Sequence, residues 1–312
     1  MSDSLSGATP NKLDNRVIVR TILWIGLGLA AGLFAVSHPC RQAQQLESGG
    51  NYKGAIDVYT AALANPIFAI DPTIYYERAY CKRMARDFYG AIKDLSDALK
   101  LRRDYWYLWG FKGIGVRHYL DYTFNLELGK TYFDMGDFSK SVESFTKALG
   151  VEKTVEAYQG RSSAFEKEKK NSEAEQDLLA AVESSKPGAD REKALHLRAL
   201  FYWRLGRRDE ALRDLTEAVG QHTCREAFTD KGFIEFEKGM YKESVADFSK
   251  SIDISPSERA YHGRALAQSN LGDYDSAESD IARAVELDPA CASVKADQQR
   301  ILQKSKNKGN ND

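Results

Sequence analysis

Residues 271–289 read LGDYDSAESDIARAVELDP, and variants of this stretch recur along most of the chain. If Tyr274 is taken as a reference position, six earlier copies place an equivalent residue at positions 241, 208, 171, 138, 88 and 52. The spacings from the last copy back to the first are 33, 33, 37, 33, 50 and 36 residues. A nearly constant period of this length predicts stacked helical hairpins, because each hairpin buries its apolar face only against its neighbours.

Three positions of every copy hold a small residue, and a fourth holds a bulky one. The small residues nine before the reference position are Ala43, Ala79, Gly129, Ser162, Ala199, Gly232 and Ala265. The small residues at the third position after the reference are Ala55, Ala91, Ser141, Ala174, Ala211, Ser244 and Ala277. The small residues at the tenth position after it are Ala62, Ala98, Ala148, Ala181, Ala218, Ser251 and Ala284. The bulky residues, seven after it, are Tyr59, Leu95, Phe145, Leu178, Leu215, Phe248 and Ile281. Two helices approach to ~8 Å only where one of them lacks bulk, so these small columns predict the contact points between helices.

These columns, together with the turn sequences Gly-Asp-Phe at 136–138 and Gly-Asp-Tyr at 272–274, resemble the tetratricopeptide repeat family. The resemblance covers residues 39 to about 289. It implies an all-α fold, an α-solenoid in which about seven helix pairs form a right-handed superhelix. It further implies that the first helices of the pairs line a concave groove, and that the protein binds another polypeptide and is not an enzyme.

The repeat domain is expected to span residues 38–304 and to close with a capping helix. A stack of repeats needs a terminal unit whose outer face is polar, and residues 291–304 fit that role. Residues 305–312 form a polar tail that we expect to be disordered.

An aromatic-rich insertion at residues 102–121, RRDYWYLWGFKGIGVRHYLD, accounts for the 50-residue spacing. Its Trp106, Trp109 and Phe111 alternate with basic residues, a composition typical of interfacial segments and partner-binding loops. The alternative is an extra or lengthened helix whose aromatic side chains pack onto the neighbouring repeats. Insertions in a repeat array project from one face, so we treat this stretch as a second candidate binding surface.

The N-terminal region divides into a polar tail at residues 1–16, expected to be disordered, and an apolar segment at residues 17–37. The apolar segment is either a permanent signal anchor or a signal peptide cleaved at residues 35–37. We favour the anchor, because signal peptides rarely carry a long polar leader and the span can be extended to about twenty residues. Gly28 and Gly32 have the spacing that lets two membrane helices pair closely, which allows a homodimer.

The flanking charges predict the orientation of this segment. Lys12, Arg16 and Arg20 precede its uncharged apolar run at residues 22–36, whereas Arg41 and Lys53 follow that run. Under the positive-inside rule the N-terminus is cytoplasmic and the repeats are extracytoplasmic. The chain contains no Asn-x-Ser/Thr glycosylation site, so we favour a bacterial inner membrane with a periplasmic repeat domain over a eukaryotic lumen.

Composition and motifs disfavour several classes of function. The formal net charge of -1 argues against nucleic-acid binding, which needs clustered Lys and Arg. The four cysteines are far apart, and the five histidines have no metal-ligand spacing. No phosphate-binding loop or nucleophile motif stands out. We therefore expect no catalytic residue, no cofactor and no metal site.

The family resemblance identifies the residues expected to face the groove. They are Tyr76, Tyr80, His196, Trp203, Phe233 and His262. If they do face it, the groove accepts a peptide or helix through apolar and aromatic contacts; the alternative for the aromatic residues is core packing. The sequence thus predicts a membrane-tethered scaffold that recruits or assembles other proteins. The alternative is an envelope structural protein, released by cleavage at the N-terminal segment and acting by self-association.

Overall fold

The computed structural model describes the backbone of residues 39–109, 114–221 and 225–309, and the side chains of residues 41–66, 68–101, 119–220 and 225–307. Every regular element in these residues is a helix, so the prediction of an all-α fold is confirmed for this part of the chain. The chain divides into two compact units, Met1–Asp137 and Phe138–Asp312.

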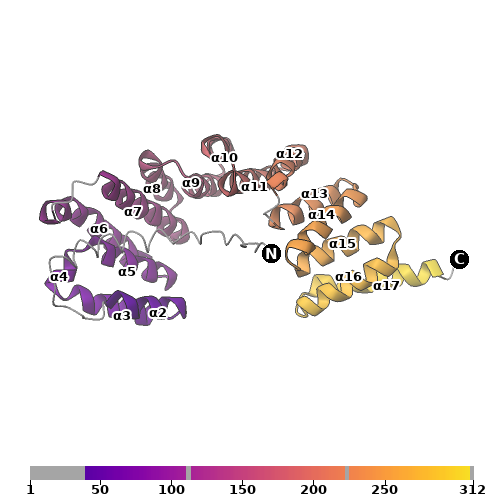
Figure 1. Cartoon of the computed structure of the whole chain (residues 1–312), viewed down its shortest axis with the longest axis horizontal. Coiled ribbons are helices and arrows are strands. Elements are labelled where there is room, and N and C mark those ends of the chain that lie inside the picture. The colour runs from indigo at the N-terminus through magenta and orange to yellow at the C-terminus, as the bar shows by residue number, and fades with distance from the viewer. Residues whose placement is uncertain (1–38, 110–113, 222–224, 310–312) are drawn as a thin grey trace, which may run out of the picture. The chain divides into compact units, whose positions relative to one another are not determined.

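The N-terminal unit contains the helices of the first two repeats and the first helix of the third (Figure 1). They are α2 (Pro39–Ser48), α3 (Tyr52–Leu63), the short α4 (Pro66–Ala69), α5 (Pro72–Met84), α6 (Phe88–Trp109) and α7 (Ile114–Met135). The longer helices pack against one another in chain order, α2 on α3, α3 on α5, α5 on α6 and α6 on α7.

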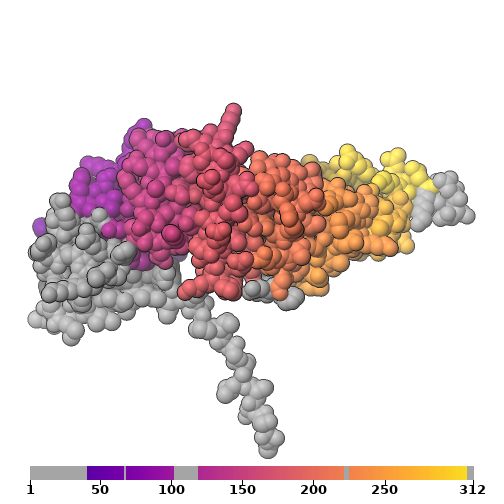
Figure 2. Space-filling model, turned by 90° about the horizontal axis from the view of Figure 1, so that it is seen from above, coloured from indigo at the N-terminus to yellow at the C-terminus, as the bar shows by residue number. Residues whose placement is uncertain are grey.

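The C-terminal unit continues the same succession to the end of the chain. Its helices are α8 (Phe138–Val151), α9 (Val155–Lys167), α10 (Asn171–Ser184), α11 (Ala189–Arg204), α12 (Arg208–Ala218), α13 (Arg225–Glu237), α14 (Tyr241–Ile254), α15 (Glu258–Leu271), α16 (Tyr274–Leu287) and α17 (Ala292–Gly309). A 3-10 turn, Val219–Gln221, follows α12. Residue number advances in order along this unit in Figure 2, as expected for a stack in which each repeat contacts only its neighbours.

The first helices of the repeats form a layer of their own in the C-terminal unit. Each first helix packs on the second helix of its own repeat and on that of the preceding repeat. In addition, α9 contacts α11, α13 contacts α15, and α15 contacts α17. Within the described residues, no two successive second helices make comparable contact, so the first helices approach one another more closely.

The turn between the two helices of a repeat explains why Gly-Asp recurs in the sequence. Gly272 ends α15 with a φ of 79°, a left-handed conformation that glycine adopts without steric cost. Asp273 then caps α16 by accepting a hydrogen bond from the backbone N–H of Ser276. Asn51 and Asp87 make the same cap at the start of α3 and α6. A glycine followed by a short polar residue is thus enough to reverse the direction of the chain between the two helices.

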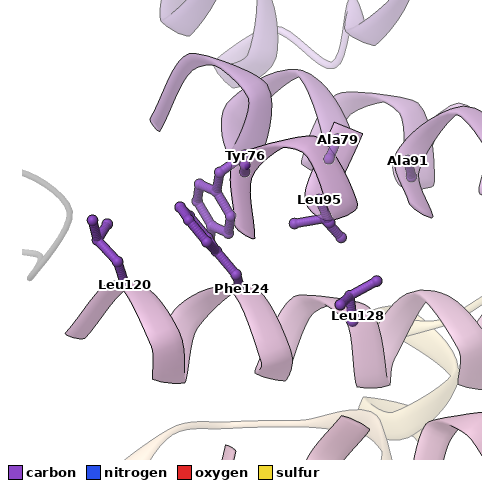
Figure 3. Packing of buried hydrophobic residues seen from close by; sticks show 8 residues of the cluster. Tyr76, Ala79, Ala91, Leu95, Leu120, Phe124 and Leu128 are labelled. Carbon is purple, nitrogen blue, oxygen red and sulfur yellow. The ribbon is translucent and has the colours of Figure 1, made fainter. Parts of the chain in front are cut away.

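The small columns lie at the helix contacts, as predicted. Every residue of the three columns is buried, and so is every residue of the bulky column. Figure 3 shows the arrangement in the N-terminal unit, where Ala79 and Ala91 let α5 and α6 approach and Leu95 points toward α7. The Tyr76 and Phe124 rings lie beside one another in the same cluster, 5.7 Å between centroids.

Bulky and small residues also complement one another between repeats. Phe145 of α8 packs on Gly160 of α9, and Phe248 of α14 packs on Gly263 of α15. A Cβ atom at either glycine would overlap the phenyl ring. The two phenylalanines of the bulky column therefore each face a glycine on the next helix.

The insertion is helical on both sides of its centre. Residues 102–109 lengthen α6 and residues 114–121 begin α7, which corresponds to the lengthened-helix alternative for the backbone. The side chains of Trp106 and Trp109, and the whole of Phe111, lie outside the described residues.

The predicted N-terminal tail and the predicted membrane segment, with Gly28 and Gly32, likewise lie outside the described residues. Among the helices that are described, none has the length and apolarity needed to cross a bilayer.

Candidate partner-binding face

Four of the predicted groove residues lie on the layer of first helices in the C-terminal unit. His196 and Trp203 are seven residues apart on α11, which places them on one side of that helix. Phe233 lies on α13 and His262 on α15. We call this surface the first-helix face; with the charged groups that contact these residues, it comprises His196, Trp203, Asp230, Phe233, Glu237, Arg259, His262 and Asp297.

A buried carboxylate links three successive first helices of this face. Asp230 of α13 is 3% exposed. His196 Nε2 on α11 donates a hydrogen bond to Asp230 Oδ2 over 2.7 Å, and Arg259 Nη2 on α15 lies 2.7 Å from Asp230 Oδ1. A charged group this deeply buried needs such partners, so the contacts fix the relative positions of the three helices.

His262 repeats this arrangement at the end of the stack. Its Nε2 atom donates to Asp297 Oδ2 of the capping helix α17 over 2.9 Å, while its Nδ1 atom lies 3.9 Å from Glu258. Arg300 Nη1 also binds Asp297, at 2.9 Å from Oδ1. Both histidines therefore bridge to an acid about one repeat later, and both imidazoles are held by contacts within the chain.

The aromatic residues of the face are half-buried and fixed in orientation. The Phe233 ring packs edge-on against Phe248, with 4.9 Å between centroids, and the Arg259 guanidinium lies 4.8 Å from the centre of the Phe233 ring. Trp203 Nε1 donates to Glu237 over 3.1 Å, and Glu237 also accepts from Arg208 Nε. Part of each ring stays open to solvent, so a partner can bury it without reorienting it.

The remaining two predicted residues lie in the N-terminal unit. Tyr76 is only 9% exposed and packs on Phe124, so the structure places it in the core and not on an open surface. Tyr80 is half-buried; it packs edge-on against Tyr52 with 6.4 Å between centroids, and the Arg83 guanidinium lies 5.5 Å from its ring. Of the two tyrosines, Tyr80 alone retains an accessible ring.

The chain matches the family model "Tetratricopeptide repeat" over residues 126–190, 196–259 and 258–291. Together these matches cover just over half of the sequence and include α13, α15 and most of α11. The chain belongs to the tetratricopeptide repeat family. The resemblance inferred from the small columns is therefore correct.

Several solved structures share the fold. A tetratricopeptide repeat protein from Parabacteroides merdae is 16% identical, with a TM-score of 0.53, over 85% of this chain and 97% of that one. PilF of Pseudomonas aeruginosa is 12% identical, with a TM-score of 0.55, over 74% and 97%. A chain of the Cut9–Hcn1 hetero-tetramer is 15% identical, with a TM-score of 0.51, over 95% and 55%. A comparison with curated proteins gives no match.

An ion pair joins the two helices of most of these tetratricopeptide repeats, and the sequence analysis missed it. The Arg lies on the first helix, ten residues before the reference position, and the Asp lies on the second helix, six residues after it. The Arg donates two hydrogen bonds of 2.6–2.8 Å to the Asp carboxylate. The pairs are Arg78–Asp94, Arg161–Asp177, Arg198–Asp214 and Arg264–Asp280. We call this pair the repeat clamp. Its signal in the sequence is an Arg and an Asp sixteen residues apart at the same place in four of the seven repeats.

Two repeats lack the clamp and one carries a modified form. In the first repeat the two clamp positions hold Gln42 and Val58, and in the third repeat they hold Leu128 and Ser144. In both repeats the Arg and the Asp are therefore replaced together. In the sixth repeat Lys231 replaces Arg. Its ammonium group contacts both Asp247 and Glu235.

The Lys231 cluster places two carboxylates around one cation. Glu235 is 2% exposed, and its Oε2 atom has no hydrogen-bond partner. Burial raises the pKa of Glu235 to about 7, and the nearby Asp247 charge adds to this rise, against the lowering effect of Lys231. The Lys231 cluster therefore changes charge near neutral pH through Glu235.

The described residues offer little chemistry beyond binding. No group of three His, Cys, Asp or Glu side chains among them could hold a metal ion. Cys81 is buried, its thiol donates to Glu47 Oε1 over 3.3 Å, and burial raises its pKa, so the reactive thiolate is disfavoured. Tetratricopeptide repeat folds typically serve as non-catalytic interaction modules, and these side chains match that role.

Proposed function

We propose that this protein is a scaffold that binds a segment of another polypeptide on the first-helix face of its C-terminal unit. Tetratricopeptide repeat proteins generally bind other proteins. The observation that carries the proposal is the pair of oriented, half-exposed aromatic rings, Trp203 and Phe233, on adjacent first helices. Aromatic side chains of this kind supply much of the binding energy in protein interfaces.

Charged side chains around these rings are suited to orient a bound segment. Glu237 holds the Trp203 indole, and Arg259 covers one side of Phe233 while it pairs with Asp230. Because these contacts already exist in the free protein, little side-chain freedom is lost when a partner binds. An apolar centre with a polar rim is the usual anatomy of a protein interface.

The N-terminal sequence is the basis for a proposed location of the scaffold. We propose that residues 17–37 anchor the chain in a bacterial inner membrane, with the repeats on the periplasmic side, and that Gly28 and Gly32 allow two anchors to pair. The scaffold would then recruit or assemble its partners at the membrane surface. N-terminal sequencing of the mature protein tests this part: an intact N-terminus in the membrane fraction supports an anchor, and a chain that starts near residue 38 excludes it.

The binding proposal is tested by quantitative pull-down from membrane extracts. The variants are Trp203→Ala and Phe233→Leu, since leucine keeps an apolar contact with Phe248. The matched control is Tyr89→Ala, because Tyr89 is an aromatic residue 77% exposed on the second helix α6. We expect the two face variants to lose partners that the native chain and the Tyr89 variant retain. Identical partner lists for all four proteins would refute binding on this face.

A further inference from the structure

The junctions between successive repeats of the C-terminal unit are of two kinds. At each junction the second helix of one repeat packs on the first helix of the next. The pairs α8–α9 and α14–α15 pack extensively, whereas α10–α11 and α12–α13 pack less extensively. The looser junctions also have the longer connections, residues 185–188 and 219–224, against 152–154 and 255–257 at the tight ones. Both looser junctions flank the fifth repeat, which consists of α11 and α12.

A phenyl ring seated on a glycine closes each tight junction. Gly160 of α9 and Gly263 of α15 each receive a phenylalanine ring from the preceding repeat, where a Cβ atom would leave no room for it. At the looser junctions the equivalent position holds Leu197 on α11 and Asp230 on α13, and the bulky column supplies leucine in place of phenylalanine. A larger residue at this position keeps the facing helices from approaching as closely, so less apolar surface is buried between them.

The repeat clamp also crosses the tight junctions. Arg161 Nη1 donates to the Thr146 hydroxyl of the preceding repeat, and Arg264 Nη1 donates to the Ser249 hydroxyl, each over 3.0 Å. The clamp therefore links three helices at these junctions. At the α10–α11 junction the position of the two hydroxyl residues is held by Leu179, whose side chain cannot accept a hydrogen bond.

At the α12–α13 junction both partners of this link are polar, yet each one binds elsewhere. Thr216, the equivalent of Thr146, donates to the backbone carbonyl of Leu212 on its own helix over 2.7 Å. Lys231, the equivalent of the clamp arginine, contacts Asp247 of its own repeat. Thr216 and Leu212 also line an open hollow on α12. The second looser junction is thus open beside Thr216.

Partly exposed ion pairs join the fifth repeat to its neighbours instead. Arg207 donates to Glu175 of the preceding repeat over 2.9 Å, and Arg208 donates to Glu237 of the following repeat over 2.7 Å. The four side chains are 28–46% exposed. Ion pairs with this exposure contribute little to stability and are weakened by salt.

The first helices stay joined across the α12–α13 junction. His196 Nε2 on α11 donates to the buried carboxylate of Asp230 on α13. Among the described residues, the successive second helices α10, α12 and α14 make no comparable contact with one another. A loosened junction should therefore open on the side of the second helices, with the first helices as the pivot.

We propose that the fifth repeat is an articulation point, where the α10–α11 and α12–α13 junctions open on the second-helix side while the α8–α9 and α14–α15 junctions stay closed. Regions with few buried apolar contacts open at the lowest free-energy cost, and hinge motions use such regions. Salt should favour the opening, because ion pairs hold these junctions. The articulation sets the angle between α11 and α13, which carry Trp203 and Phe233, but it does not depend on the proposed binding of a partner there.

Spin-label distances in the full-length chain without a partner test the proposal. An exposed position five residues after the reference position recurs on every second helix of this unit; its residues are Glu143, Gln176, Arg213, Ala246 and Ser279. A genetically encoded amino acid carries the label, so that the native cysteines stay unchanged. The pairs 176/213 and 213/246 span the looser junctions. The pairs 143/176 and 246/279 span the tight junctions and are the matched controls.

We expect distance distributions about twice as wide across the looser junctions as across the tight ones. Raising the ionic strength from about 0.05 to about 0.5 M should widen them further and leave the controls unchanged. Equal widths for all pairs, or widths at the looser junctions that salt does not change, would overturn the proposal. Either result leaves the proposed function untouched, because no partner is present.

A variant that copies the tight junction provides a second test. Leu178→Phe, Leu179→Thr and Leu197→Gly together place the ring, the hydroxyl group and the glycine of the α8–α9 junction between α10 and α11. This variant should narrow the 176/213 distribution to the control width and leave the 213/246 distribution wide. A folded variant whose 176/213 distribution stays wide would overturn the assignment of the articulation to these positions. The native-chain distributions decide the proposal if the variant does not fold.

Discussion

Removing one partner of a repeat clamp should destabilise its repeat strongly. In the fourth repeat, Arg161 Nε and Nη2 donate to the two oxygens of Asp177 over 2.8 and 2.6 Å, and Nη1 donates to Thr146 over 3.0 Å. The side chains of Arg161 and Asp177 are 21% and 6% exposed. Asp177→Ala leaves the guanidinium group largely enclosed without a counter-ion. We expect a loss of about 2–4 kcal/mol in the free energy of opening this repeat.

Replacing both partners should cost much less than the two single substitutions together. The sequence of the third repeat already carries Leu128 and Ser144 at the clamp positions, and both are buried. The double variant Arg161→Leu, Asp177→Ser copies that pair into the fourth repeat. Because it leaves no uncompensated charge, we expect a coupling energy on the order of 2 kcal/mol.

Hydrogen exchange on the full-length chain is the suitable assay, since repeat arrays open locally and a single unfolding midpoint would average over repeats. Peptides from α9 and α10 report the effect, and peptides from α15 and α16 serve as an internal reference. Glu143→Ala is the matched control: Glu143 and Lys147 form an ion pair on α8 with both side chains more than half exposed. The loss caused by Glu143→Ala should be much smaller than that caused by Asp177→Ala, because an exposed ion pair contributes little to stability. If Asp177→Ala opens the repeat no more than Glu143→Ala, or if the single effects simply add, the clamp does not stabilise the hairpin.

Three further predictions concern packing, pH and reactivity. Ala211→Leu should overpack a fully buried helix contact and cost about 1–3 kcal/mol, measured by hydrogen exchange in α11 and α12; unchanged exchange would contradict the helix register. Glu235 binds protons more tightly in the folded chain, with a pKa of about 7 against 4.5, so stability should fall as pH rises between these values. Glu235→Gln should remove that slope, and an unchanged slope would show that Glu235 is not its source. Finally, Cys81 should resist alkylation at pH 8 until the chain unfolds, whereas Cys291, which is partly exposed, should react first; peptide mapping separates the two.

The sequence was sufficient to predict the packing of the repeats. Only a helix contact requires alanine, glycine or serine at the same three positions in every copy, so Ala211 and its equivalents could be assigned without coordinates. The clamp was missed for a different reason. Charged residues such as Arg161 and Asp177 look like an ordinary solvated helix surface, and their pairing depends on how the two helices of a hairpin face each other.

The candidate site was predicted less completely than the packing, because the exposure of its residues depends on which other side chains cover them. Tyr76 has the register of a groove residue, but Phe124 from the lengthened α7 packs on it and places it in the core. The histidines were assigned the correct helices, yet their acidic partners lie 34 and 35 residues away in regions with no distinctive motif.

Site-specific photo-crosslinking in intact cells tests most directly whether the first-helix face holds a partner. A photoreactive phenylalanine derivative replaces Trp203 on α11 in one strain, and Leu179, 37% exposed on the second helix α10, in another. Binding on the first-helix face predicts crosslinked adducts with another polypeptide from position 203 and none from position 179. Adducts from position 179 alone, or equal adducts from both positions, would contradict it.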